Sequence, residues 1–111
     1  MKAYVTQYNP RHNFAALQGN AEDVVFLTEH EYMPLPLPSH DGNKAIVKSI
    51  YATLKDFNPA KDFLVPVGSP ISIGVAFAAL DSYGIGEFNV LKWNNQSNRY
   101  DIVQVFTQTG D

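Results

Sequence analysis

The order of apolar and polar residues along the chain predicts strands that alternate with helices. Residues 2–9 alternate with the period of a strand, whereas residues 24–28 and 63–67 are short apolar runs rich in β-branched side chains. Unbroken apolar runs are typical of strands covered on both faces, so we expect the strand at 24–28 to lie at or near the centre of a sheet. Two further strands are predicted at residues 88–93 and 101–106.

Two helices are predicted between these strands. Residues 43–58 place their apolar side chains on one face, which is typical of a surface helix that buries one side. Residues 71–80 are uncharged and almost entirely apolar, which predicts a helix covered on both sides within the fold. Residues 11–23 show weak periodicity and are expected to be mostly loop, with one short helical turn at residues 14–17.

The sequence of elements indicates the fold class. Strands and helices that alternate are typical of α/β proteins with right-handed crossovers. We therefore predict a single α/β domain over residues 1–111, with a mostly parallel, Rossmann-like sheet of about five strands and two main helices. The polar loop at residues 93–100 is expected to close a C-terminal antiparallel hairpin, followed by a loose tail at residues 107–111.

Composition and charge exclude several classes of partner and chemistry. The 111-residue chain is the size of one domain, and it lacks cysteine, which excludes disulfides, thiolate metal sites and thiol catalysis. The net charge is −3, and the eight Lys and Arg residues are scattered, so a nucleic-acid partner is not expected. No stretch has the length and composition of a membrane span or a signal peptide, which makes a cytoplasmic location the default expectation.

The turn between the strand at residues 63–67 and the following helix is a candidate ligand site. Ser69 is a good N-cap, Pro70 suits the first helical position, and Gly68 permits a sharp turn. A helix N-terminus at the carboxyl end of a strand can bind an anion, with Gly68, Ser69 and Ser72 as candidate ligand-binding residues. The segment lacks the spacing of a P-loop or a dinucleotide fingerprint, so structural capping is the alternative.

Catalytic and metal sites receive little support from the sequence. The nucleophile-elbow pattern is absent, and nothing pairs Ser69 or Ser72 with a histidine. Residues 29–31 read Glu-His-Glu, but an extended segment would place the histidine on the opposite side from the two carboxylates. We therefore predict no catalytic residues, no metal and no cofactor.

Gly74 is unusual because it lies inside a predicted helix. Glycine costs about 1 kcal/mol relative to alanine there, so we expect a compensating close approach of the helix to the sheet. Together with Ala76, Ala78 and Ala79 it forms a small-residue surface that could also admit a second helix. Both a monomer and a homodimer remain open.

The proline-rich segment and the hairpin tip are candidate partner-binding surfaces. Residues 28–42 carry prolines at 34, 36 and 38, which favours an extended connection with few ladder hydrogen bonds. A stiff apolar segment can bind a partner at low entropic cost, although its leucines could instead cover one end of the core. The candidate contact residues are Tyr32, Met33, Leu35, Leu37, Trp93, Arg99 and Tyr100.

Three segments resemble a family of small uncharacterised α/β proteins of unknown function that bacteriophages and prophages encode. They are residues 4–10, residues 67–74, and residues 91–94 together with Arg99 and Tyr100. The resemblance covers most of the chain. It implies a phage or bacterial cytoplasmic context, and it supplies no catalytic residues.

Two functions follow as hypotheses. The first is a small non-enzymatic interaction protein, a phage accessory factor that acts on a host or phage protein through the proline-rich segment and the hairpin tip. The alternative is a nucleotide or phosphometabolite binder, or a weak hydrolase, that uses the helix N-terminus at residues 68–70.

Overall fold

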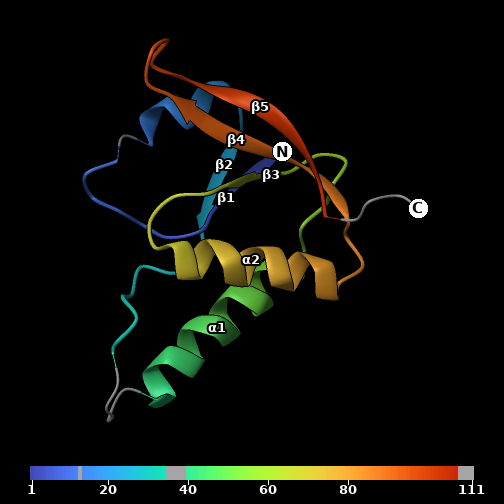
Figure 1. The fold of residues 1–111 in the computed structure, drawn as a ribbon. Helices are drawn as coiled ribbons and strands as arrows, with labels where there is room; N and C mark the ends of the chain where they lie inside the picture. Colours follow the sequence, from blue (N-terminus) through green and yellow to red (C-terminus); the bar gives the residue numbers. More distant parts are fainter. Residues whose placement is uncertain (13, 35–39, 108–111) are drawn as a thin grey trace.

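The computed structural model describes residues 1–12, 14–34 and 40–107, which form a five-stranded sheet with helices on both of its faces (Figure 1). The strands are β1 (Lys2–Val5), β2 (Asp23–Phe26), β3 (Phe63–Val65), β4 (Glu87–Asn94) and β5 (Arg99–Phe106). The helices are the 3-10 helix η1 (Ala15–Gly19) and the α-helices α1 (His40–Leu54) and α2 (Pro70–Ser82).

The strand order is β2-β1-β3-β4-β5. β1 pairs in parallel with β2 and β3, and β3 pairs in parallel with β4, whereas β4 and β5 are antiparallel. The predicted α/β class, five strands, two main helices and C-terminal hairpin are confirmed. The sheet is mixed, however, and is not the mostly parallel, Rossmann-like sheet that we expected. The loop at residues 95–98 is too short for a parallel crossover, so β5 must turn back along β4.

The two faces of the sheet are covered unequally (Figure 1). The connection from β1 to β2 crosses the sheet in one direction, whereas the connections from β2 to β3 and from β3 to β4 cross in the other. Crossovers between parallel strands are right-handed, so two crossovers that run in opposite directions along the sheet lie on opposite faces of it. Both α-helices therefore pack on one face, and only η1 and its flanking loops cover the other.

Each face has its own hydrophobic core. The helical face buries Tyr4, Leu64 and Phe88 of the sheet against Ile50 of α1 and Leu80 of α2. The cluster on the η1 face consists of Ala3, Val5, Leu17, Ala21, Phe63, Val65, Leu91 and Tyr100. Because neighbouring residues of β1 and β3 enter opposite cores, β3 is an unbroken apolar run. The three residues of β1 that follow Lys2 are apolar for the same reason, although we expected residues 2–9 to alternate.

β2 lies at the edge of the sheet, so our expectation of a central position is wrong. Its apolar run is nevertheless explained, because Val25 packs against the core of the helical face and Val24 against the core of the η1 face. Phe26 is exposed and makes edge-to-face contacts with Tyr8 and Phe14. An edge strand can thus have the apolar sequence of a buried strand when the connections before and after it cover both of its faces.

The expected burial of α2 on both sides is also wrong. Ala76 and Ala79 are fully buried, but Ile71 is 55% exposed, and Gly74 and Ala78 lie on the same exposed face. A Cβ atom added to Gly74 would meet no heavy atom within 4 Å, so the predicted close approach of this glycine to the sheet does not occur. The outer face of α2 is open to solvent.

Three boundaries differ from the sequence-based expectations. β1 ends at Val5 rather than at residue 9, and α1 begins at His40 rather than at residue 43. Thr107, expected in the loose tail, donates its N–H to the Gly86 carbonyl at 2.9 Å, and the rest of the tail lies outside the described residues. Among the helices in the described ranges, none is long and apolar enough to cross a membrane.

Candidate functional site

The carboxyl ends of the parallel strands β1, β2, β3 and β4 share one edge of the sheet, which we call the carboxyl edge. Open α/β sheets bind ligands at this edge, at the point where connections leave neighbouring strands in opposite directions. Here that point lies between β1 and β3, because the chain goes from β1 to β2 on one side and from β3 to β4 on the other. Several hollows lie along the carboxyl edge, and two of them contain the candidate residues.

Gln7 connects three segments at the point between β1 and β3. Its buried side chain accepts a hydrogen bond from the Ser69 N–H at 2.6 Å and donates one to the His30 carbonyl at 3.0 Å. Gly68 passes over it with a φ of 90°, and a Cβ atom on Gly68 would lie 2.4 Å from the Gln7 Oε1 atom. The turn therefore requires glycine both for its backbone conformation and for the space that the glutamine occupies.

The first hollow, which we call the polar pocket, has a volume of about 490 Å³ and lies beside this turn. Its lining residues are Gln7, Tyr8, Asn9, Pro10, Arg11, Glu31, Gly68 and Ser69. It brings one guanidinium group and one carboxylate to the N-terminus of α2. This arrangement suits a small polar ligand that carries both hydrogen-bond acceptors and donors.

The α2 N-terminus uses much of its own donor capacity. The Ser69 hydroxyl accepts the Ile71 N–H at 3.1 Å, the Ser69 N–H is bound to Gln7, and Pro70 has no N–H to offer. Ser72 is fully buried, and its hydroxyl donates to the Tyr32 hydroxyl at 2.9 Å. Of the three residues predicted to bind ligand, Gly68 and Ser69 line the polar pocket, whereas Ser72 helps to position Tyr32.

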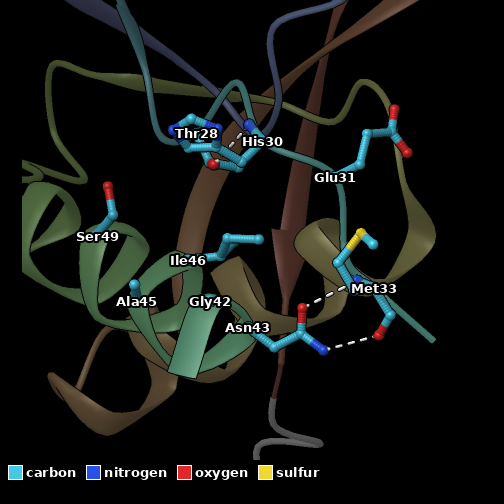
Figure 2. Close-up of a pocket in the computed structure, with 9 residues that line it drawn as sticks. All are labelled: Thr28, His30, Glu31, Met33, Gly42, Asn43, Ala45, Ile46 and Ser49. Atoms are coloured by element: carbon cyan, nitrogen blue, oxygen red, sulfur yellow. Dashed lines mark hydrogen bonds between the residues drawn. The ribbon is translucent and has the colours of Figure 1, made fainter. Parts of the chain in front are cut away.

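The second hollow is a groove of about 560 Å³ between residues 28–33 and the first part of α1 (Figure 2). We call it the Met33 groove. It is lined by Thr28, His30, Glu31, Met33, Gly42, Asn43, Ala45, Ile46 and Ser49. Ile46 and Ala45 supply apolar surface, and hydroxyl, imidazole and amide groups surround them. An apolar floor with a polar rim is typical of surfaces that bind another protein.

Met33 is held over this groove by the side chain of Asn43 (Figure 2). The Met33 N–H donates to Asn43 Oδ1 at 2.9 Å, and Asn43 Nδ2 donates to the Met33 carbonyl at 2.9 Å. Both main-chain groups of Met33 are thus satisfied, while its side chain is 58% exposed. The structure places Tyr32 and Met33 at the groove end of the proline-rich segment, and the predicted contacts Leu35 and Leu37 lie outside the described residues.

The three residues of the hairpin that were predicted to contact a partner differ in how far they are exposed. Arg99 is exposed, Trp93 is half-buried, and Tyr100 is buried in the core of the η1 face. The Trp93 and Tyr100 rings pack edge to face with centroids 5.0 Å apart, and the Tyr100 hydroxyl is hydrogen-bonded to His12. Burial lowers the pKa of His12 and raises the pKa of Tyr100. Tyr100 therefore offers little surface to a partner, whereas Arg99 is accessible.

Within the described parts of the chain, no group of three or more His, Asp or Glu side chains could hold a metal ion. Glu31 lines both hollows and His30 lines the groove, while His30 donates its N–H to the Thr28 hydroxyl at 3.1 Å. Of the serines considered as nucleophiles, Ser69 acts as a helix cap and Ser72 is bonded to Tyr32. Both serine hydroxyls are thus used in hydrogen bonds within the fold.

A family model described as Phage Pam3 gp32-like protein matches residues 1–107. The chain belongs to this phage protein family. The match covers every described strand and helix, and it confirms the resemblance to small phage proteins that the sequence segments indicate. No curated protein matches the chain, and no solved structure does.

Two residues that organise the carboxyl edge were not among the candidates from sequence. Gln7 appeared only as part of an alternating strand, and Asn43 only as the residue that opens a helix. Their partners are 62 and 10 residues away along the chain. No local pattern in the sequence indicated either contact.

Proposed function

We propose that the protein is a non-enzymatic binding protein, a phage accessory factor that contacts a host or phage protein through the Met33 groove. The observation that carries the proposal is the state of Met33, whose main chain is fixed by Asn43 while its side chain is 58% exposed. Ordering an exposed apolar side chain before binding lowers the entropy cost of association.

Several contacts fix the segment that leads to Met33. Gln7 holds the carbonyl of His30, and the Thr28 carbonyl accepts the Tyr8 N–H at 2.8 Å. Tyr32 is held through its hydroxyl by buried Ser72. The segment is therefore attached to the sheet and to both helices, which makes it a rigid side of the groove rather than a loop that must be ordered on binding.

The composition of the groove indicates the chemistry of the partner. Methionine adapts to different apolar shapes and is common at protein-binding surfaces. The floor at Ala45 and Ile46 suits one or two apolar side chains, and the amide of Asn43 and the hydroxyl of Ser49 suit main-chain groups beside them. We expect a short apolar segment of another protein to bind there. The hairpin tip at residues 95–98 follows the carboxyl end of β4 and provides polar contacts at the same edge.

Capture of partners from a bacterial lysate tests the proposal when the wild-type protein is compared with Met33→Ser. The substitution should lower the recovery of a specific partner about tenfold, since a central apolar contact is worth more than about 1 kcal/mol. Ile71→Ser is the matched control, because Ile71 is 55% exposed but lies on α2, away from the groove. Recovery that is equal for wild type and Met33→Ser, or no specific recovery at all, would contradict the proposal.

A second candidate function is the binding of a small polar ligand in the polar pocket. The pocket lies at the point between β1 and β3 where such sheets bind ligands, and it contains Arg11 and the capped N-terminus of α2. Because Gln7 and Ser69 already use two helix N–H groups, Arg11 supplies the main attraction for an anion.

A thermal-shift series with inorganic phosphate and nucleotides tests this second function. A ligand that binds only the folded protein raises the free energy of unfolding by mass action, by about 2.7 kcal/mol at 100 times its Kd, and the melting temperature rises with it. The shift should disappear in Arg11→Gln and persist in Met33→Ser. A panel without any shift at millimolar concentrations would exclude this function and leave the first one unaffected.

A further inference from the structure

The outer edge of β5 presents main-chain groups that no strand of the sheet satisfies. β5 is the last strand in the order and pairs with β4 through eight consecutive residues without a bulge. The Thr107 N–H points to Gly86, so the main-chain groups of residues 103 and 105 also face β4. Those of Ile102, Gln104 and Phe106 consequently face away from the sheet.

The side chains along this edge are apolar and exposed. Ile102 is 59% and Phe106 is 62% exposed, on the face of the sheet that η1 covers only in part. Natural proteins usually protect an edge strand with a lysine, a proline or a bulge. Residues 102–106 contain neither charge nor proline, and their pairing with β4 is regular. The edge is therefore a competent template for another strand.

The sequence of this strand matches itself when it is reversed. Residues 102–106 read Ile-Val-Gln-Val-Phe, which is apolar, β-branched, polar, β-branched and apolar about Gln104. In an antiparallel pair centred on Gln104, Ile102 lies opposite Phe106 of the second copy, and Val103 lies opposite Val105 of the second copy. Asp101 then faces a threonine, so no like charges oppose one another. A pair centred on Asp101 would instead place two carboxylates together.

From this pattern we infer that the protein forms a two-fold dimer in which the β5 strands of two copies pair antiparallel about Gln104. The pair joins the two sheets into one continuous sheet and satisfies the outward main-chain groups of Ile102, Gln104 and Phe106 in both copies. Because it uses β5 of both copies, the assembly closes at two chains. The carboxyl edge with the Met33 groove is not part of this contact.

Cross-linking of single-cysteine variants tests the dimer and its register together, since the natural chain has no cysteine. In Gln104→Cys the two Cα atoms lie about 5.5 Å apart across the pair. In Ile102→Cys, the matched exposed control on the same strand face, the two residues are displaced by about 13 Å along the strand. A short bismaleimide should therefore cross-link Gln104→Cys into a dimer and leave Ile102→Cys as single chains.

The oligomeric state of the wild-type protein is measured beside these variants by size-exclusion chromatography with light scattering. We expect a mass of two chains, reduced to one chain in Phe106→Lys with an unchanged far-UV circular dichroism spectrum. A wild-type protein that stays monomeric at millimolar concentration would overturn the inference. So would cross-linking that is equal in both cysteine variants, or preferential cross-linking of Ile102→Cys, which would require another register.

Discussion

The exposed glycine of α2 provides a direct test of the helix's environment. Gly74 lies in the interior of Pro70–Ser82, on the solvent face, with no heavy atom within 4 Å of the position that a Cβ would take. Replacement by alanine therefore meets no steric cost. Alanine loses less backbone entropy than glycine when a helix forms, so Gly74→Ala should stabilise the fold by about 0.8–1.0 kcal/mol.

The expected change in melting temperature follows from the size of the chain. An unfolding entropy of about 2.1 cal/mol/K per residue gives roughly 0.23 kcal/mol/K for 111 residues, so the stabilisation corresponds to a rise of about 4 °C. Differential scanning calorimetry measures this shift, and urea unfolding gives the free energy independently. Ala78→Gly, on the same exposed face, is the reciprocal control and should lower the melting temperature by a similar amount.

A lower melting temperature for Gly74→Ala would refute this reasoning. It would mean that another surface approaches the glycine closely, as the small-residue pattern of the sequence had indicated. A loss that grows with protein concentration would place that surface on a second copy of the chain, because association contributes to stability in a concentration-dependent way.

Two further predictions concern the turn at Gly68 and the titration of His12. Gly68→Ala should lower the free energy of unfolding, measured with urea, by about 1–3 kcal/mol or more, because a φ of 90° is strained for alanine and the new Cβ would collide with Gln7. An unchanged urea midpoint would show that the glutamine can move aside. Burial lowers the pKa of His12 below 6.5, so the unfolded chain binds a proton more readily than the folded protein does. The free energy of unfolding should therefore fall as the pH drops from 6.5 towards the pKa of His12 in the folded protein. His12→Asn should flatten that part of the stability profile measured by urea unfolding between pH 7.5 and 5, and an equal slope in both proteins would contradict the assignment.

The fold was largely predictable because its signals are local. The one-sided apolar face of α1, the cap at Ser69, the alternation that predicted β1 and the apolar run of β3 are each evident from a few neighbouring residues. The position of β2 was not predictable from its run of apolar residues. An edge strand that is covered on both faces by the connections around it has the same unbroken apolar run as a central strand. The antiparallel pairing of β5 was predictable from its short polar loop, but the mixed sheet that results does not confirm the Rossmann-like expectation.

The candidate site was only partly predictable, since its geometry depends on contacts between distant segments. Proline spacing identified the segment of Met33, but not the asparagine that holds it. The turn at Gly68 was recognised as a sharp one, whereas the reason for its glycine is the side chain of Gln7, which follows the carboxyl end of the neighbouring strand β1. Side-chain to main-chain hydrogen bonds of this kind leave no periodic pattern in the sequence.

The position of β1 inside the sheet also governs the time at which the protein can fold during synthesis. β1 is made first, yet one of its two neighbours, β3, begins at Phe63, beyond the midpoint of the chain. The hairpin of β4 and β5, which has the shortest connection between paired strands, is synthesised after the other strands. β1 therefore stays unpaired on one side until residues 63–65 have been synthesised, and a pairing of such long sequence separation forms slowly. During this interval the apolar residues of β1 are exposed on one side, and such exposed surface favours aggregation before the sheet is complete.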